Sequence, residues 1–235
     1  MAGRIAYYGN IVRDGLVLLL DAAKKDSYPG SGTLWRDISG NGNNGTLTNG
    51  PTFNSNNGGS IVFDGIDDTT NCGLISSLPS GISPRTIQVW INYSSGFNPS
   101  VLASISGYGT DQLGRIFQLS VGGPGFNNEK LVIWGNNNNY ISSFTLDRET
   151  WTNVTVTVTS GVTFPRITIY KNGVSDGGAE TNINTLNTES YVVGGRLGTY
   201  SRFKGRIAQN LVYNRALTPA EVLQNFNATR GRYGI

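Results

Sequence analysis

Carboxylate side chains are the groups in this 235-residue sequence that could most directly perform chemistry. Cleavage of a glycosidic bond with retention of configuration needs two carboxyl groups about 5–5.5 Å apart. None of the five glutamates shares a predicted strand with a second carboxylate. They are Glu129, Glu149, Glu180, Glu189 and Glu221.

Two closer pairs of acidic residues also fail this requirement. Asp147 and Glu149 have a suitable spacing, but they lie in a polar connection before Trp151. Asp67 and Asp68 are adjacent, so on a strand their side chains would point to opposite faces. We therefore predict that the protein is not an enzyme.

The composition removes several other catalytic chemistries. There is no histidine, which excludes the usual general base, the Ser-His and Cys-His nucleophile pairs and imidazole metal sites. The single cysteine, Cys72, excludes a disulfide within the chain and thiolate zinc or iron-sulfur sites. The remaining candidates are binding and assembly functions.

A tryptophan beside a run of asparagines is the best local candidate for sugar binding. An aromatic platform next to amide donors and acceptors is the chemistry that carbohydrate recognition uses. The alternative is that the tryptophan, which ends a predicted strand, packs in the core. The predicted glycan-binding residues are Trp134, Asn136, Asn138 and Tyr140.

Charge and hydropathy argue against nucleic acid and membrane partners. A net charge of +3, from 18 basic and 15 acidic residues, is too small a bias to indicate nucleic-acid binding. The longest apolar run, Leu16 to Leu20, is too short for a signal sequence or a membrane span. We therefore expect a protein that is not exported and does not enter a membrane.

The sequence contains 32 glycines and 26 asparagines, which favour turns and disfavour helices. We therefore expect strands joined by turns, and not helices, to position these residues. Short apolar or alternating runs recur every 8–15 residues or so, which is typical of a β-sandwich or barrel. The predicted strands are Leu16–Asp21, Gly45–Leu47, Ser60–Phe63, Thr70–Cys72, Thr86–Tyr93, Val101–Ile105, Phe117–Val121, Leu131–Trp134, Ile141–Thr145, Trp151–Thr159, Arg166–Lys171, Tyr191–Gly194 and Phe203–Tyr213.

Two local patterns are sharper than the rest. Valines and threonines alternate from Asn153 to Thr159, which predicts a strand with one buried face and one face in or near solvent. We expect it to pair with Arg166–Lys171, which runs into Asn172-Gly173, a strong signal for a two-residue hairpin turn. The one predicted helix begins after Thr218, where Pro219 and Glu221 complete a capping box.

Four segments, taken together, resemble the laminin-G-like, concanavalin-A-like superfamily. They cover residues 15–228 in the order and spacing of that family. The segments are Gly15–Ala22 followed by Trp35–Leu47, Ser60–Asp68, Trp151–Val154 leading to Ile169–Gly173, and Phe203–Gln209 leading to Tyr213–Thr218. The resemblance implies an all-β, antiparallel two-sheet jelly-roll sandwich with one short C-terminal helix.

The resemblance also implies a calcium site at the rim, because relatives bring several Asp and Asn residues close together there. Calcium accepts irregular sets of six to eight oxygen ligands. The alternative is that these side chains cap turns, which is the commoner role of Asp/Asn-Gly clusters. The predicted ligands are Asp21, Asp37, Asn41, Asn43, Asp64 and Asp67. No cofactor is expected to be required.

The ends of the chain are candidates for assembly contacts. We divide the sequence into an N-terminal arm (1–14), a laminin-G-like domain (15–229) and a C-terminal tail (230–235). The arm is too apolar to remain free in water and too short to form its own core. Either each end docks on a neighbouring subunit or it packs back on its own sandwich. The predicted assembly residues are Tyr7, Tyr8, Ile11, Arg232 and Tyr233.

Both ends also resemble virion proteins of tailed bacteriophages, through Tyr7–Gly15 and Asn225–Tyr233. This resemblance implies a non-catalytic structural protein of the virion, assembled in the host cytoplasm, and we predict a capsid decoration or cement protein. A tail or fibre subunit is the alternative within that class. A carbohydrate-binding, lectin-like adhesion module for host surface glycans is the alternative from another class. The expected partners are other virion proteins, further copies of this chain and host surface polysaccharide.

Overall fold

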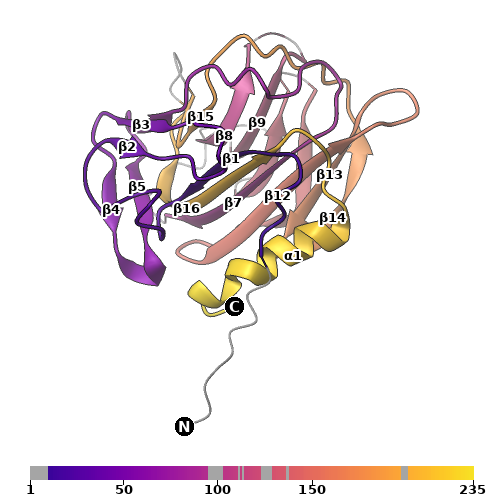
Figure 1. Cartoon of the computed structure of the whole chain (residues 1–235). Coiled ribbons are helices and arrows are strands. Elements are labelled where there is room, and N and C mark those ends of the chain that lie inside the picture. The colour runs from indigo at the N-terminus through magenta and orange to yellow at the C-terminus, as the bar shows by residue number, and fades with distance from the viewer. Residues whose placement is uncertain are drawn as a thin grey trace.

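A computed structural model describes residues 10–94, 103–110, 112, 114–122, 129–135, 138–196 and 201–235. Within these residues the chain forms two antiparallel sheets packed face to face, and a helix, α1 (Pro219–Thr229), lies against one of them (Figure 1). The expected all-β sandwich with a short C-terminal helix is confirmed.

Each sheet has eight strands and is named here after one central strand. The β7 sheet has the order β14 (Val174–Glu180), β13 (Arg166–Lys171), β12 (Trp151–Thr159), β7 (Arg85–Tyr93), β16 (Lys204–Tyr213), β5 (Ser60–Asp64) and β4 (Thr52–Asn54), with β1 (Leu16–Asp21) also paired to β16. The β9 sheet has the order β11 (Tyr140–Thr145), β10 (Lys130–Trp134), β9 (Ile116–Val121), β8 (Ala103–Gly109), β15 (Val192–Val193), β6 (Thr69–Asn71), β3 (Gly45–Thr48) and β2 (Leu34–Trp35).

Each of the thirteen predicted strands overlaps an observed strand, with Val101 and Leu102 of one prediction outside the described residues. In the part of the chain that the structure describes, three further strands have no counterpart in the prediction. β2 and β4 have two and three residues, which is too few to establish a period-2 pattern. β14 contains two glycines and no alternation, and it is a strand because it completes the hairpin with β13. The hairpin turn has the positive φ angles that Asn-Gly favours, 52° at Asn172 and 79° at Gly173.

The core lies between the two sheets and follows the predicted alternation. Val154, Val156 and Val158 on β12 are completely buried there. Burying a valine side chain contributes about 1.5–3 kcal/mol relative to exposing it. β12 pairs with β13 from Val154 to Thr159, as the sequence predicts.

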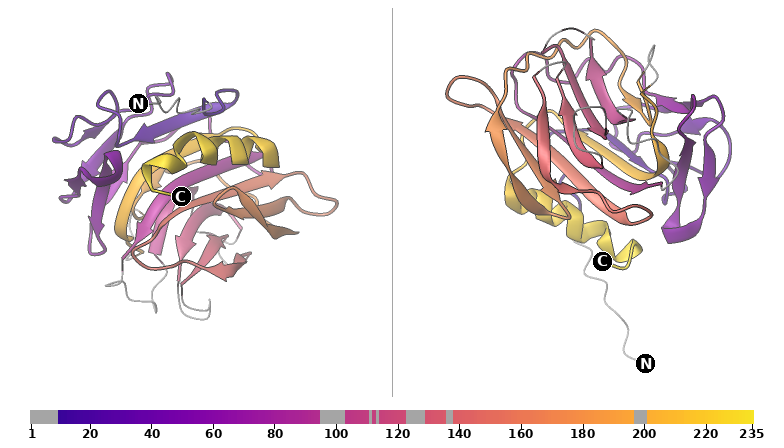
Figure 2. Two further views of the ribbon diagram at one scale, coloured as in Figure 1. Left: turned by 90° about the horizontal axis from the view of Figure 1, so that it is seen from below. Right: turned by 180° about the vertical axis from the view of Figure 1, so that it is seen from behind.

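The opposite face of β12 differs from the prediction, because it is buried as well. Asn153 and Thr155 are 1% and 0% exposed, although that face was expected in or near solvent. Helix α1 packs on the outer face of the β7 sheet (Figure 2), and Asn225 of α1 donates to Gln88, whose amide donates to Asn153. The expectation was wrong because a two-residue period cannot reveal a helix that covers the polar face.

Helix α1 begins with the predicted capping box. Thr218 Oγ1 accepts from Glu221 N, and the Glu221 carboxylate accepts from Thr218 N at 2.8 Å. Phe226 of α1 stacks on Trp90 of β7, with ring centroids 5.7 Å apart. The helix is followed by a 3-10 turn, η2 (Arg230–Arg232). Among the described residues, no helix has the length and apolar character needed to cross a membrane.

Candidate functional site

The residues expected to bind calcium lie in three separate hydrogen-bonded groups. In the first, Asp37 accepts four hydrogen bonds, from Leu19 N, Ser39 N, Ser39 Oγ and Asn43 N, at 2.8–2.9 Å. The amide groups of Asn41 and Asn43 donate to the Val17 carbonyl oxygen. These contacts agree with the alternative in which the side chains cap turns, because the Asp37 carboxylate already accepts hydrogen bonds from protein donors.

The second group holds Asp21, which is 2% exposed. Its carboxylate accepts from Gln209 Nε2 at 3.0 Å and from Arg232 Nη1 at 2.8 Å, in an ion pair with the end of the chain. A buried carboxylate with a cationic partner is neutralised and does not fit a calcium ligand.

The third group contains Asp64 and Asp67, together with Asp68, for which no metal role was predicted. Each offers a carboxylate oxygen within 4.8 Å of the others. Asp67 and Asp68 were expected to point apart, which is wrong because both follow β5 in a turn and precede β6. Burial raises the pKa of Asp68, and the charges of Asp64 and Asp67 act in the same direction. Of the predicted ligands, Asp64 and Asp67 are the two carboxylates that the structure brings together.

The predicted glycan-binding residues lie at the β10–β11 end of the β9 sheet. Trp134 ends β10 and pairs with Gln118 of β9, so the two side chains lie on one face of the sheet. Tyr140 begins β11 and packs partly against the core. Asn138 is half-buried, and Asn136 lies outside the described residues.

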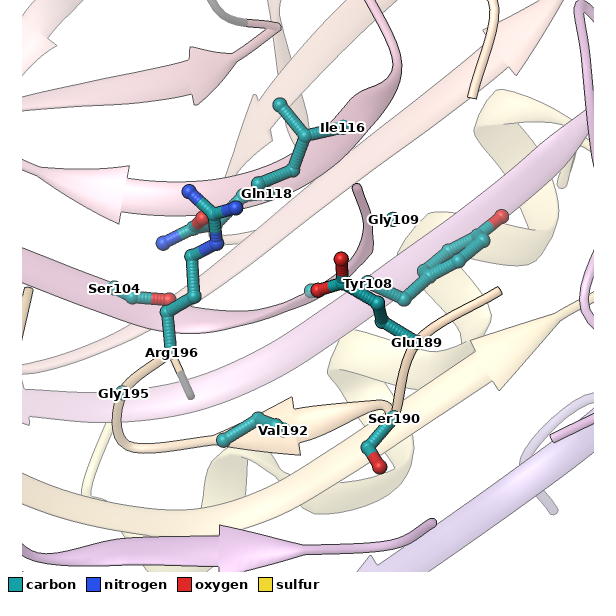
Figure 3. Close-up of a pocket in the computed structure, with 11 residues that line it drawn as sticks. Ser104, Tyr108, Gly109, Ile116, Gln118, Glu189, Ser190, Val192, Gly195 and Arg196 are labelled. Atoms are coloured by element: carbon teal, nitrogen blue, oxygen red, sulfur yellow. The ribbon is translucent and has the colours of Figure 1, made fainter. Parts of the chain in front are cut away.

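A pocket opens on that same face, away from the core (Figure 3). Gln118 of β9 and Ser104 of β8 line it, while Glu189 and Arg196 come from the segments on either side of β15. The enclosed volume is about 20 Å³. This is enough for one water molecule or one hydroxyl group and too little for a sugar ring.

The pocket contains polar atoms that lack hydrogen-bond partners. Both the Nε2 and Oε1 atoms of Gln118 are buried without a partner, and so is Ser104 Oγ. Buried polar groups are paired in the great majority of cases, so these three atoms are an exception that requires an explanation. A hydroxyl group can donate to one atom of the amide and accept from the other. The chemistry therefore suits a hydroxylated ligand or a bound water.

The sequence offered little indication of this pocket. Gln118 and Ser104 lie on mostly buried strands that also contain Ser120 and Ser106, so neither stands out in the sequence. Glu189 and Arg196 line the pocket only because β15 brings their segments to β8. The one indication is the period-2 pattern of β9, which places Gln118 opposite the core residues Phe117 and Leu119. Among the residues that line the pocket, Glu189 is the single carboxylate, so the pocket itself lacks a hydrolytic pair.

The expected assembly residues that can be described pack against the same chain. Tyr233 stacks on Trp90, with ring centroids 4.0 Å apart, and Arg232 pairs with Asp21. Ile11 packs partly against the apolar cluster beneath α1. The described contacts therefore agree with the alternative in which the chain end packs back on its own sandwich. There Arg232 compensates the buried charge of Asp21, and Tyr233 covers Trp90. Tyr7 and Tyr8 lie outside the described residues.

Solved structures with the same fold include carbohydrate-active proteins. Domain 4 of AbnA, an extracellular arabinanase from Geobacillus stearothermophilus solved with arabinotriose, has a TM-score of 0.65 and 19% identity, over 89% of this chain and 97% of that one. The binding domain of Paraclostridial Mosquitocidal Protein 1 has a TM-score of 0.66 and 18% identity, over 92% and 52%. Trypanosoma rangeli sialidase with sialic acid has a TM-score of 0.66 and 15% identity, over 93% and 34%.

At these identities the likeness is one of fold, and this chain spans about half of the mosquitocidal structure and a third of the sialidase. No curated protein matches the chain in sequence. The family model described as the concanavalin A-like lectin/glucanases superfamily matches residues 64–223, more than half of the sequence. The chain therefore belongs to the concanavalin A-like lectin/glucanases superfamily.

Proposed function

We propose that this protein binds a glycan on the outer face of the β9 sheet and does not cleave it. The observation that carries the proposal is the buried, unpartnered amide of Gln118 in a pocket that also contains Ser104 Oγ. Leaving such a group unsatisfied costs about 1–3 kcal/mol, which a ligand hydroxyl would recover on binding. The superfamily and its carbohydrate-active structural neighbours support the same ligand class.

The pocket and Trp134 contact different parts of the ligand. One hydroxyl group enters the small pocket and pairs with Gln118, while the sugar ring stays outside it. Trp134, opposite Gln118 on the neighbouring strand, offers an aromatic surface to the next part of the ligand. Such a contact orients a saccharide without catalysis.

A glycan array tests this function. Wild-type protein is expected to bind a specific host polysaccharide. Gln118→Ala and Trp134→Ala are each expected to lower the affinity at least tenfold. This factor corresponds to about 1.4 kcal/mol, the contribution of one uncharged hydrogen bond or one stacking contact. Gln224→Ala on helix α1 is the matched control. Silence of the wild type across host glycans, or equal binding by all variants, would contradict the proposal. Release of reducing sugar would contradict its non-catalytic part.

We further propose that the domain is part of a tailed-phage virion, as a capsid decoration protein that forms homo-oligomers. The support is the resemblance of residues 7–15 and 225–233 to phage virion proteins. Glycan binding and decoration are compatible, because a decorated particle would carry many copies of the pocket. Mass spectrometry of purified virions is expected to detect the chain, and electron microscopy of labelled particles to place it on the capsid. A label on the tail would favour the fibre alternative, and absence of the chain from virions would reject both.

A further inference from the structure

A second groove lies on the other sheet, on the outer face of β7, β16, β5 and β4, and plays no part in the proposed glycan pocket. Its volume of about 650 Å³ falls within the roughly 300–1,000 Å³ of small-molecule sites. The residues that line it include Asn54, Val62, Asn92, Glu149, Lys204 and Arg206. It is therefore large enough for a sugar residue and its neighbour.

Two cations project into this groove from one strand. Lys204 and Arg206 are two residues apart on β16, which places both side chains on the same face. Arg206 lies over the Trp151 ring, 5.5 Å from its centroid, and donates to Asn92 Oδ1 at 2.9 Å. The stem of Lys204 packs against Gly65. A Cβ atom added to Gly65 would lie 2.7 Å from the Cβ atom of Lys204. The Arg206 guanidinium is thus held by Trp151 and Asn92, and Lys204, whose stem packs on Gly65, lines the same groove.

Donors and acceptors both line the groove: Lys204, Arg206 and two asparagine amides can donate, and the carboxylates of Asp64 and Glu149 accept. Asn92 Oδ1 is occupied by Arg206, and Asn54 Oδ1 by the Asn56 amide at 2.9 Å, which leaves the NH₂ groups of both asparagines unused. Asp64 Oδ1 is occupied by the Ile66 amide at 2.7 Å. Glu149 forms an ion pair with Arg206 through Oε2, 4.0 Å from Nη2, and its Oε1 accepts from Ser94 Oγ at 3.3 Å. Arg206, Lys204 and the two asparagine NH₂ groups lie close enough together in the lining to hold one acceptor-rich anion.

We propose that this groove binds an acidic saccharide through its carboxylate, which Arg206 and Lys204 hold together. The amide groups of Asn54 and Asn92 donate to ring or hydroxyl oxygens, Glu149 accepts from a hydroxyl, and Val62 contacts the apolar face of the ring. Because this site lies on the outer face of the opposite sheet, it does not depend on Gln118 or Trp134. The domain would then present separate sites for a neutral and an acidic glycan.

Isothermal titration with trigalacturonate, and with its fully methyl-esterified form as the uncharged control, tests the inference. Wild-type protein is expected to bind the acid and not the ester, with affinity that falls as salt rises from 50 to 300 mM. Arg206→Gln is expected to weaken binding at least tenfold, since it removes a charge-assisted hydrogen bond. Lys204→Ala is expected to weaken it several-fold. Lys25→Ala, an exposed lysine outside the groove with the same charge change, is expected to have no effect.

Amide shifts in the NMR spectrum locate the ligand and separate this inference from the proposed function. Shifts at Val62, Asn92 and Gly205, retained in Gln118→Ala, would support the groove whatever becomes of the other pocket. Shifts centred on Gln118, equal binding of acid and ester, undiminished binding by a folded Lys204→Ala protein, or no binding at millimolar concentration would each overturn it.

Discussion

At the scale of single residues, Gln118 is a buried side chain whose hydrogen-bonding capacity the fold leaves unused. The side chain is 2% exposed, and neither of its polar atoms has a partner. By contrast, Gln209 is equally buried and its amide donates to Asp21 at 3.0 Å. The two glutamines differ in whether the fold itself satisfies them.

We therefore predict that Gln118→Leu stabilises the ligand-free protein by about 1–2 kcal/mol and abolishes glycan binding, because it removes an unsatisfied buried amide. Gln209→Leu, the matched control, is expected to destabilise the protein because it removes one of the hydrogen bonds that the buried Asp21 carboxylate accepts. Urea unfolding measures both effects. If Gln118→Leu proved less stable than wild type, the amide would have a partner in solution and the pocket would lose its rationale.

Asp68 carries a second prediction at this scale. Burial and the nearby carboxylates raise the pKa of Asp68, so its ionisation costs stability. The stabilisation that the protonated carboxyl provides at low pH is lost as the pH rises from the ordinary value of 3.8 through the raised one. Asp68→Asn, which keeps an oxygen to accept from Asp64 N, is expected to raise the melting temperature at pH 7 in EDTA. Asp26→Asn, at an exposed carboxylate, is the control and is expected to change little.

Calcium is expected to make wild type melt at a higher temperature than Asp68→Asn, because a bound cation removes the repulsion among Asp64, Asp67 and Asp68. Added calcium should raise the melting temperature of wild type and not that of Asp68→Asn. An equal response of both proteins, or none in wild type, would reject these carboxylates as a calcium site.

At the scale of elements, helix α1 depends on its first turn. Glu221 closes the capping box with Thr218 and pairs with Arg215 Nη2 at 2.6 Å. The hydrogen bond from Arg215, together with those from Thr218, lowers the pKa of Glu221 to about 2. The sequence signalled the capping box directly, whereas the contribution of Arg215, six residues earlier, required the folded loop.

Glu221→Ala is predicted to destabilise the protein by about 1–2 kcal/mol at pH 7 through loss of the cap and the ion pair. A lowered folded-state pKa gives a contribution that is present above pH 4.5 and lost as the pH falls toward about 2. Thermal melts should thus show the difference between wild type and variant shrinking over that range. Asn227→Ala, exposed on the same helix, should show no such pH dependence, and a constant difference for Glu221→Ala would refute the assignment.

At the scale of the whole molecule, the C-terminal residues fasten the helix to the sandwich. Arg232 pairs with the buried Asp21, and Tyr233 lies against both Trp90 and Trp151, with ring centroids 4.0 and 4.7 Å apart. Asn57 links the same region to η1 (Asn56–Gly58) by donating to Arg232 O. Arg232 and Tyr233 are therefore part of the domain's own packing.

Truncation after Thr229 is predicted to cost about 3–5 kcal/mol, because it leaves the Asp21 charge buried without its cation and uncovers Trp90. Removal of only Gly234 and Ile235, which are exposed, is the control and should be nearly neutral. Urea unfolding decides the matter. A truncated protein as stable as wild type would show that these contacts contribute little. That result would favour a tail that docks on a neighbouring subunit.

The sequence by itself determined the elements whose causes are local. Alternation along β12 and β13, the Asn172-Gly173 turn and the Thr218 capping box depend on residues close together in the chain, so the strands, the hairpin and the helix were predictable. The tertiary structure decided which distant residues meet. It separated Asp21 and Asp37 from Asp64, put Gln118 beside Trp134, covered the polar face of β12 with α1 and joined Arg206 to Asn92. These contacts depend on strand order and side-chain packing, and neither leaves a periodic trace in the sequence.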